Sequence, residues 1–325
     1  MCALFGWLDY GKKLPHKTLR KFTQELANAA EERGTDASGI SYILNGKVKI
    51  YKKANPAHKI RFNFPEGTTA IMGHTRFTTQ GNQKFNFNNH PFYGKADKEF
   101  AFAHNGVLYN DKDLRKEKNL PKTHIETDSY IAVQLIEKQK KLDFESLQSM
   151  AEDVQGNFTF TILDEDNKLY FIKGSSPMFL IYFEKLGFFA YASTETIMQK
   201  ALKKSGLSYY KYQIIKLNEG DILSIDSNGK IETSEFQFDD LSLLSKFRYG
   251  DFNYYDPSHE DMLLEMCSCF GVSEEDILLL LDYDYTADDI EEMLMDLDLI
   301  SETVDELKEV NEFEDIWEYL SLIHI

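Results

Sequence analysis

The sequence predicts an α+β protein in which a large layered domain over residues 2–240 is followed by a linker over 241–257 and an acidic all-α tail over 258–325. Short apolar and aromatic runs of β type dominate the first part, and only three stretches there show clear helical periodicity. Strands that are apolar on both sides must be covered on both sides, which indicates stacked sheets with helices over them. Acidic residues gather in the last part, which marks it as a separate unit.

The expected strands are short apolar runs, separated by turn signals such as Asn45-Gly46. They are Ala3–Leu8, Gly39–Leu44, Val48–Lys52, Thr69–His74, Phe100–His104, Asn157–Leu163, Lys168–Ile172, Phe179–Phe183 and Phe188–Ala192. The expected helices of this part carry apolar residues on one stripe. They are Thr18–Glu32, Asp128–Lys140 and Phe144–Val154.

The net charge of −18 is unevenly distributed. Residues 246–325 hold 24 of the 54 acidic residues but only 3 of the 36 basic ones, so the remainder of the chain is close to neutral. A surface this acidic repels nucleic acid and anionic membranes, so neither is expected as a partner. The tail is expected to form short helices, because Ser258, Ser273 and Thr286 each precede acidic residues that suit a helix N-terminus.

The three cysteines form no disulfide framework, and no apolar stretch approaches the roughly 20 residues that a membrane helix needs. These features favour a cytoplasmic protein. Cys2 is unusual, because removal of Met1 gives one residue both a thiol and a free α-amine. Such an amine has a pKa of about 7.7 to 8.0 and can serve as the base for its own thiol.

Five clusters downstream of Cys2 carry residue types that suit chemistry on an amino acid amide. They are RGTDASG (33–39), GHTRFTTQG (73–81), NNHPF (88–92), HNGV (104–107) and ETDS (126–129). Binding a free amino acid requires an arginine for its carboxylate and a carboxylate for its ammonium group. Hydrolysing its side-chain amide requires a nucleophile and N–H donors for the tetrahedral oxyanion. Each cluster also has a plain structural interpretation. Asn105-Gly106, for instance, is a good type I′ hairpin turn, and Asp128 suits a helix N-cap.

Taken in order, these motifs resemble the class II glutamine amidotransferase domain of the N-terminal-nucleophile hydrolase superfamily, over roughly residues 2–240. The His-Thr-Arg, Asn-x-His-Pro and Glu-Thr-Asp motifs are most similar to the glutaminase domain of glucosamine-6-phosphate synthase. The resemblance implies a four-layer α/β/β/α sandwich of antiparallel sheets.

The resemblance also implies roles for individual residues. Cys2 matches the nucleophile, while the Asn105 side-chain amide and the Gly106 backbone N–H match the oxyanion hole. No metal or other cofactor is expected.

For the substrate, Arg76 with Thr79 beside it matches the clamp on the glutamine carboxylate, and Asp128 matches the ligand of the α-ammonium group. Arg33 and Gly34 match a loop that lines the nucleophile.

Three residues depart from the family's pattern: Ala3 replaces a glycine, Phe77 a tryptophan and Gln80 a frequent histidine. None of them is an assigned catalytic group. The expected activity is therefore a glutaminase that releases ammonia. The acidic tail is too small to be an acceptor domain, so the ammonia is expected to pass either to an acceptor in a partner chain or directly to a small acceptor molecule. Two alternatives stay open: an N-terminal-nucleophile amidohydrolase acting on another amide, and a catalytically silent binding or adaptor protein.

Overall fold

The computed structural model describes residues 2–238, 272–283, 285, 289–290, 293 and 299–308. The chain divides into two compact units, Met1–Asp239 and Asp240–Ile325, and each is described here by itself. The expected linker at 241–257 and the expected helix caps at Ser258 and Thr286 lie outside the described residues.

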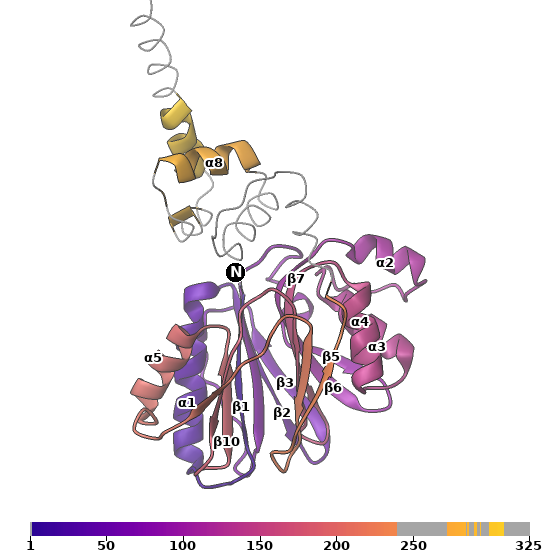
Figure 1. Ribbon diagram of the computed structural model, residues 1–325, viewed down its shortest axis with the longest axis vertical. Coiled ribbons are helices and arrows are strands. Elements are labelled where there is room, and N and C mark those ends of the chain that lie inside the picture. Colours follow the sequence, from indigo (N-terminus) through magenta and orange to yellow (C-terminus); the bar gives the residue numbers. More distant parts are fainter. Residues whose placement is uncertain are drawn as a thin grey trace, which may run out of the picture. The chain divides into compact units, whose positions relative to one another are not determined.

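The first unit consists of two antiparallel sheets packed face to face (Figure 1). One sheet has the order β11 (Gln213–Ile215), β9 (Phe179–Phe183), β10 (Phe188–Ala192), β1 (Ala3–Asp9), β4 (Ala70–Arg76), β2 (Ala37–Leu44) and β3 (Lys47–Lys53). The other has the order β13 (Ile231–Glu235), β12 (Asp221–Ile225), β8 (Leu169–Lys173), β7 (Gly156–Asp164), β6 (Glu99–Leu108) and β5 (Phe92–Lys95).

Helices cover the outer side of each sheet. The first sheet lies against α1 (His16–Ala29) and α5 (Glu195–Ser205). The second sheet lies against α3 (Tyr130–Gln139) and α4 (Phe144–Asp153), and the short α2 (Asp111–Glu117) packs beside α3. Single 3₁₀ turns occur at Ala30–Arg33, Ala57–Lys59 and Asn86–Asn88. The predicted four-layer α/β/β/α sandwich is confirmed.

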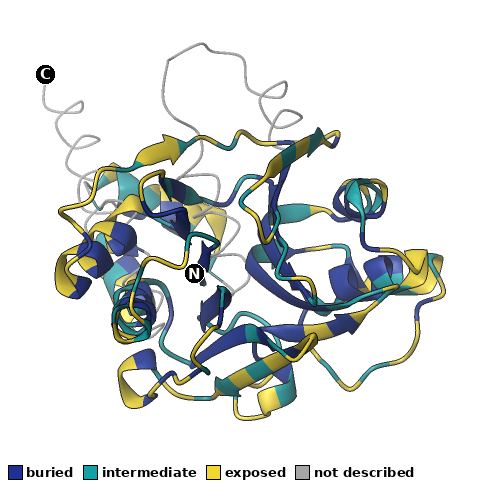
Figure 2. Cartoon of the chain, turned by 90° about the horizontal axis from the view of Figure 1, so that it is seen from below, coloured by how far each residue is buried: buried dark blue, intermediate teal, exposed yellow. Residues whose placement is uncertain are grey.

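The alternation of side chains along β1 explains why this strand is apolar at nearly every position. Phe5 and Trp7 pack toward the helices, whereas Leu4 and Leu8 pack toward the other sheet. A strand in the middle of a layered sandwich is buried on both faces, so the usual apolar–polar alternation is lost. Figure 2 shows the inner strands largely in dark blue, with exposed residues on loops, on outer helix faces and on edge strands.

All nine predicted strands are present, and the end positions of most of them shift by only one or two residues. The expected helix Thr18–Glu32 is α1 continued by the 3₁₀ turn at Ala30–Arg33. Six elements were not predicted: β5, α2, α5, β11, β12 and β13. The four strands among them have three to five residues and contain polar residues or glycine, so they lack the continuous apolar run that marks the five-residue strands β9 and β10.

The segment around Asn105 and Gly106 differs from both sequence-based expectations. It is neither a strand end nor a hairpin turn, because β6 continues through it to Leu108. Asn105 pairs with Thr159, and Gly106 pairs with Phe158. The hairpin interpretation is therefore wrong: the partner strand lies some 50 residues further along the chain, beyond the reach of local turn propensity.

The described part of the second unit contains α8 (Glu274–Asp282). The predicted cap at Ser273 is confirmed, since its hydroxyl accepts a hydrogen bond from the Asp276 N–H at 3.2 Å. Ile277 and Leu280 of α8 are buried, and Lys308 forms an ion pair with Asp276 at 2.6 Å. Among the described residues, no helix is both long enough and apolar enough to cross a membrane.

Candidate active site

The antiparallel pairing of β1 and β4 brings the chain start next to the arginine motif. Ala3 pairs with Thr75, so Cys2 lies beside the end of β4, where Arg76 is the last residue. The Cys2 thiol donates a hydrogen bond to the Phe77 carbonyl oxygen at 3.4 Å. Two segments separated by about 75 residues of sequence are thus joined at the predicted nucleophile.

The loop before β2 supports this junction from the other side. The Arg33 Nε–H donates to the Cys2 carbonyl oxygen at 3.1 Å. Gly34 lies directly against the backbone at the end of β4. A Cβ on Gly34 would come within 2.5 Å of the Arg76 carbonyl carbon and 2.6 Å of the Phe77 nitrogen. Arg33 therefore contacts Cys2, and Gly34 contacts the backbone of Arg76 and Phe77. Gly34 can approach that backbone so closely because it has no side chain.

The charges around the thiol indicate which groups lie near it. Burial raises the pKa of the Cys2 thiol, the charge of Arg76 lowers it, and the charge of Asp128 raises it. Burial also lowers the pKa of Arg76, while Cys2 and Asp128 act in the opposite direction. The predicted nucleophile and the two predicted substrate ligands are therefore close enough to interact electrostatically. A thiol with a raised pKa needs a base before it can react as a thiolate.

Arg76 is buried, and the following loop holds its guanidinium group. Its Nη1–H donates to the Asn89 side-chain oxygen at 2.7 Å, and its Nη2–H groups donate to the carbonyl oxygens of Gln80 and Gly81. These bonds fix the direction of the guanidinium, which has further N–H donors for a carboxylate. Thr79 lies partly buried in the same loop.

Asp128 lies two residues before α3 and is linked to the predicted oxyanion strand. Its Oδ2 accepts a hydrogen bond from the Leu108 N–H at 2.7 Å, and Leu108 is the last residue of β6. The ligand predicted for the α-ammonium group is thus held by the strand that carries Asn105 and Gly106.

Asn105 and Gly106, the two predicted oxyanion donors, each have an uncommon structural feature. Asn105 is 1% exposed, and among the described residues its Nδ2 has no hydrogen-bond partner. An unpaired buried donor is costly and uncommon in a folded protein. Gly106 has φ of +132°, and a Cβ there would lie 1.9 Å from the Asn157 carbonyl oxygen. Only glycine fits this position.

Four residues inside the quoted clusters were given no role from the sequence, yet the structure places them around the site. The Asp36 carboxylate accepts from the Thr78 N–H at 2.7 Å and so positions the loop after Arg76. Asn89 holds the Arg76 guanidinium, and His104 and Ser129 lie beside Asp128. His104 and Ser129 could have been found because they adjoin Asn105 and Asp128 in the sequence, whereas Asp36 and Asn89 adjoin no assigned residue.

The departures from the family pattern leave these contacts intact. Ala3 is fully buried in β1, and the backbone of Phe77 accepts the thiol hydrogen bond. Gln80 donates from Nε2 to the Glu126 carbonyl oxygen at 3.0 Å and so ties the arginine loop to the segment before Asp128.

Three buried histidines lie near the site without forming a metal centre. Burial lowers the pKa of His74 to about 3 and lowers the pKa values of His90 and His104 as well. The rings of His74 and His90 are in contact, with centroids 4.2 Å apart. Within the described ranges, no group of His, Cys, Asp and Glu side chains is arranged to hold a metal ion.

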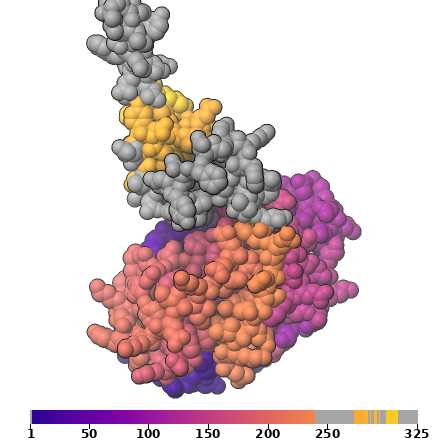
Figure 3. Space-filling view, viewed as in Figure 1, coloured from indigo at the N-terminus to yellow at the C-terminus, as the bar shows by residue number. Residues whose placement is uncertain are grey.

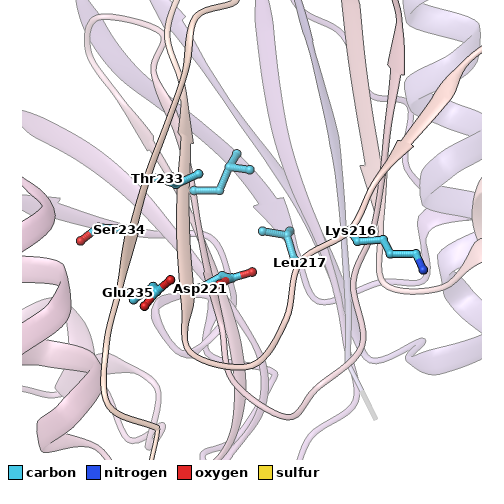
Figure 4. Close-up of a pocket in the computed structure, with 7 residues that line it drawn as sticks. Lys216, Leu217, Asp221, Thr233, Ser234 and Glu235 are labelled. Carbon is cyan, nitrogen blue, oxygen red and sulfur yellow. The ribbon is translucent and has the colours of Figure 1, made fainter.

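A separate pocket of about 340 Å³ lies near the edge of the sandwich formed by β11, β12 and β13 (Figure 4). Its lining residues come from β12, from β13 and from the connection between β11 and β12, and they are Lys216, Leu217, Asp221, Leu223, Thr233, Ser234 and Glu235. The edge strand β13 belongs to the orange surface of this unit in Figure 3. None of the predicted site residues lines this pocket.

Comparisons with known proteins agree with this geometry. A family model described as a glutamine amidotransferase domain matches residues 74–200. Glutamine–fructose-6-phosphate aminotransferase (isomerizing) of Staphylococcus epidermidis is 29% identical over 189 residues, which cover 55% of this chain and 30% of that protein. The protein 7-cyano-7-deazaguanine synthase 2 of Sulfurisphaera tokodaii is 25% identical over 229 residues, which cover 67% of this chain and 49% of that protein.

Among solved structures, glutamine phosphoribosylpyrophosphate amidotransferase from B. subtilis superposes with a TM-score of 0.58 at 18% identity, covering 73% of this chain and 49% of that one. The chain thus spans about a third to a half of the length of these relatives. The family match covers the arginine, oxyanion and Asp128 motifs, and the structural match covers the sandwich. Over residues 74–200 the chain is therefore similar to glutamine amidotransferase domains, and its sandwich has the fold seen in glutamine phosphoribosylpyrophosphate amidotransferase.

Proposed function

We propose that residues 2–238 form a glutaminase that hydrolyses the side-chain amide of glutamine and releases ammonia. The observation that supports this most strongly is the electrostatic proximity of Cys2, Arg76 and Asp128. The buried Asn105 Nδ2, which has no hydrogen-bond partner within the described residues, supports it as well. A nucleophile, a cation, a carboxylate and an oxyanion donor are the four groups that hydrolysis of a free amino acid amide requires.

In the proposed reaction the Cys2 sulfur attacks the γ-carbon of glutamine, and the thiol proton passes to the α-amine of the same residue. The Asn105 Nδ2–H and the Gly106 N–H stabilise the negative oxygen of the tetrahedral intermediate. The carbon–nitrogen bond then breaks, and ammonia leaves with the proton from the α-ammonium. Water attacks the remaining thioester, which releases glutamate and restores the thiol.

Arg76 and Asp128 give this site its preference for a free amino acid. The Arg76 guanidinium, already oriented by Asn89, binds the α-carboxylate, and Thr79 lies beside it. Asp128 binds the α-ammonium group, since its Oδ1 faces no main-chain donor in the described structure, whereas Oδ2 is taken by Leu108.

We further propose that the ammonia serves an acceptor reaction outside residues 2–238. The relatives that the chain matches are transferases and a synthase by name, and each extends well beyond the matched part. A separate protein that docks on this one would receive the ammonia, and the acidic second unit is a candidate contact for it.

The decisive experiment measures ammonia and glutamate release from glutamine by protein whose intact mass shows that Met1 has been removed. The wild type should release both in equal amounts, whereas Cys2→Ala should release neither. Asparagine and a γ-glutamyl peptide serve as competing amides. Equal activity of Cys2→Ala and wild type would exclude a covalent role for Cys2, and faster hydrolysis of another amide would show that glutamine is not the substrate.

A further inference from the structure

Asp128, His104 and Ser129 form a buried hydrogen-bond network below the proposed ammonium site. All three side chains are at most 3% exposed. The Ser129 Oγ lies 2.8 Å from the His104 Nδ1 and 3.2 Å from the Asp128 Oδ1. A serine hydroxyl has one hydrogen, so it can donate to only one of these two acceptors at a time.

The other side of the His104 ring decides where that hydrogen goes. Nε2 lies 3.3 Å from the Asn157 carbonyl oxygen, which can only accept, so Nε2 carries a hydrogen. Burial lowers the pKa of His104, and the nearby charge of Asp128 and the bond to Asn157 offset this only in part. The neutral ring therefore has a bare Nδ1, which takes the Ser129 hydrogen at the shorter of the two distances.

This arrangement leaves the two oxygens of Asp128 in different situations. Oδ2 accepts the Leu108 N–H at 2.7 Å. The Ser129 Oγ lies within donating distance of Oδ1, at 3.2 Å. With the Ser129 hydrogen given to His104, however, no described residue donates to Oδ1. A buried carboxylate oxygen without a donor is costly, and a cationic group that supplies a hydrogen there gains more than it would at a satisfied oxygen.

We propose that His104 is a positioning residue for substrate selection, which takes the Ser129 hydrogen and thereby keeps the Asp128 Oδ1 open for the α-ammonium group of glutamine. This inference rests on the proposed glutaminase function and adds a residue to it. Without an acceptor at the Nδ1 position, Ser129 would donate to Asp128 instead and occupy the oxygen that the substrate needs.

Two amide substitutions test the contacts of the His104 Nδ1 and Nε2 atoms separately. His104→Asn places a side-chain oxygen near the Nδ1 position, where it can accept from Ser129. His104→Gln reaches toward the Nε2 position, where it can donate to Asn157, but leaves Ser129 without its acceptor. The two variants are similar in polarity, so they control for general disturbance of the strand.

The measurement is the ratio of kcat/KM for glutamine to kcat/KM for glutaramate, which is glutamine without its α-amino group. His104→Gln should lower this ratio about tenfold, mainly through a higher KM for glutamine, because a hydrogen bond to a charged group is worth at least that factor. His104→Asn should keep the ratio within about twofold of the wild type, as should a control substitution of the nearby buried histidine, His90→Phe.

The double variant His104→Gln/Ser129→Ala is the critical arm. Removing the hydroxyl removes the competing donor, so the ratio should return toward the wild-type value even though two side chains are now changed. A ratio that stays as low as in His104→Gln would overturn the proposal, because it would show that the loss does not pass through the Ser129 hydrogen. An unchanged ratio in His104→Gln would overturn it as well.

Thermal unfolding of each variant shows whether a lower ratio comes from a protein that no longer folds or from a folded protein with a weaker preference for glutamine. Should His104→Gln lack a cooperative transition, Ser129→Asn tests the same idea with His104 in place, since its amide has two hydrogens and can donate to Asp128 as well as to His104. This variant should lower the ratio, and an unchanged ratio would refute the proposal. Failure of the proposed function is distinguishable, because the wild type itself would then release no ammonia from glutamine.

Discussion

Replacement of Asn105 by leucine should change activity and stability in opposite directions. Asn105→Leu keeps the approximate volume of the side chain and removes the Nδ2 donor. Since this donor is buried and has no partner in the described structure, the folded protein loses no hydrogen bond at that atom and is relieved of a desolvation cost. Such a cost is about 1–3 kcal/mol, so after some loss from imperfect packing the free energy of unfolding should rise by about 1 kcal/mol.

The same change should nearly silence catalysis. Loss of one oxyanion donor typically lowers kcat by about 10²–10³, which corresponds to roughly 2.7–4 kcal/mol. KM for glutamine should change little, because Arg76 and Asp128 carry the binding in the proposed site. The assay is steady-state ammonia release, combined with thermal and urea unfolding of the same samples. A gain of about 1 kcal/mol corresponds to a rise in Tm of roughly 2–4 °C for a unit of this size.

Asn88→Leu is the matched control. Asn88 is also fully buried, but its Nδ2 donates to the Asn82 carbonyl oxygen at 3.0 Å and to the Glu126 carboxylate at 2.7 Å. Its Oδ1 accepts from the Glu126 N–H at 2.9 Å. Three lost hydrogen bonds at roughly 1 kcal/mol each should lower the free energy of unfolding by about 3 kcal/mol.

Two results would refute the reasoning about Asn105. If Asn105→Leu were as destabilised as Asn88→Leu, the Asn105 amide would have a partner in the folded protein before substrate arrives. If Asn105→Leu kept near-full ammonia release, the amide would not stabilise the oxyanion. The first result would leave a catalytic role possible, and the second would leave the buried unpaired donor without a function.

Three further predictions follow from the same structure. An uncleavable peptide in front of Cys2 should abolish ammonia release while leaving the melting temperature unchanged, because it blocks the α-amine; activity in the extended protein would point to another base. Gly106→Ala should unfold at lower temperature and lose activity, because a Cβ would lie 1.9 Å from the Asn157 carbonyl oxygen at φ of +132°; a normal melting curve with normal kcat would contradict this. Burial, with a smaller effect of the Arg76 charge, lowers the pKa of Lys52 to about 7. The unfolded chain therefore binds more protons than the folded one between pH 7 and 10, so the stability of the wild type relative to Lys52→Met should rise over this range, as urea unfolding at several pH values would show; a difference that stays constant would mean that Lys52 is charged in the folded state.

Most strands could be predicted from the sequence, because a strand that is buried on both faces is a continuous run of apolar residues. Runs such as Phe179–Phe183 and Phe188–Ala192 are rich in aromatic residues and contain no charged residue, and they form β9 and β10 at the predicted bounds. The edge strand β13 was missed, because alternate side chains point to solvent and its five residues resemble a polar loop.

At the candidate site, too, the sequence indicated which residues matter, whereas the fold set their contacts. The sequence alone identified Cys2, Arg76, Asp128, Asn105 and Gly106 as candidates for amide hydrolysis, since that prediction depends only on which groups the chain carries and on the order of its motifs. Local propensity favoured a turn at Asn105-Gly106, and the long-range pairing of β6 with β7 overrode it.

Only the tertiary structure decided how these groups share hydrogen bonds. The partners of Cys2 come from residues 33 and 77, and Asp128 is held by Leu108 of a different element. Whether Ser129 donates to His104 or to Asp128 depends on a carbonyl oxygen of β7, which no pattern along the sequence reveals. Periodicity records which side of an element is buried, whereas the state of a buried polar group is set by atoms that the fold brings to it from distant parts of the chain.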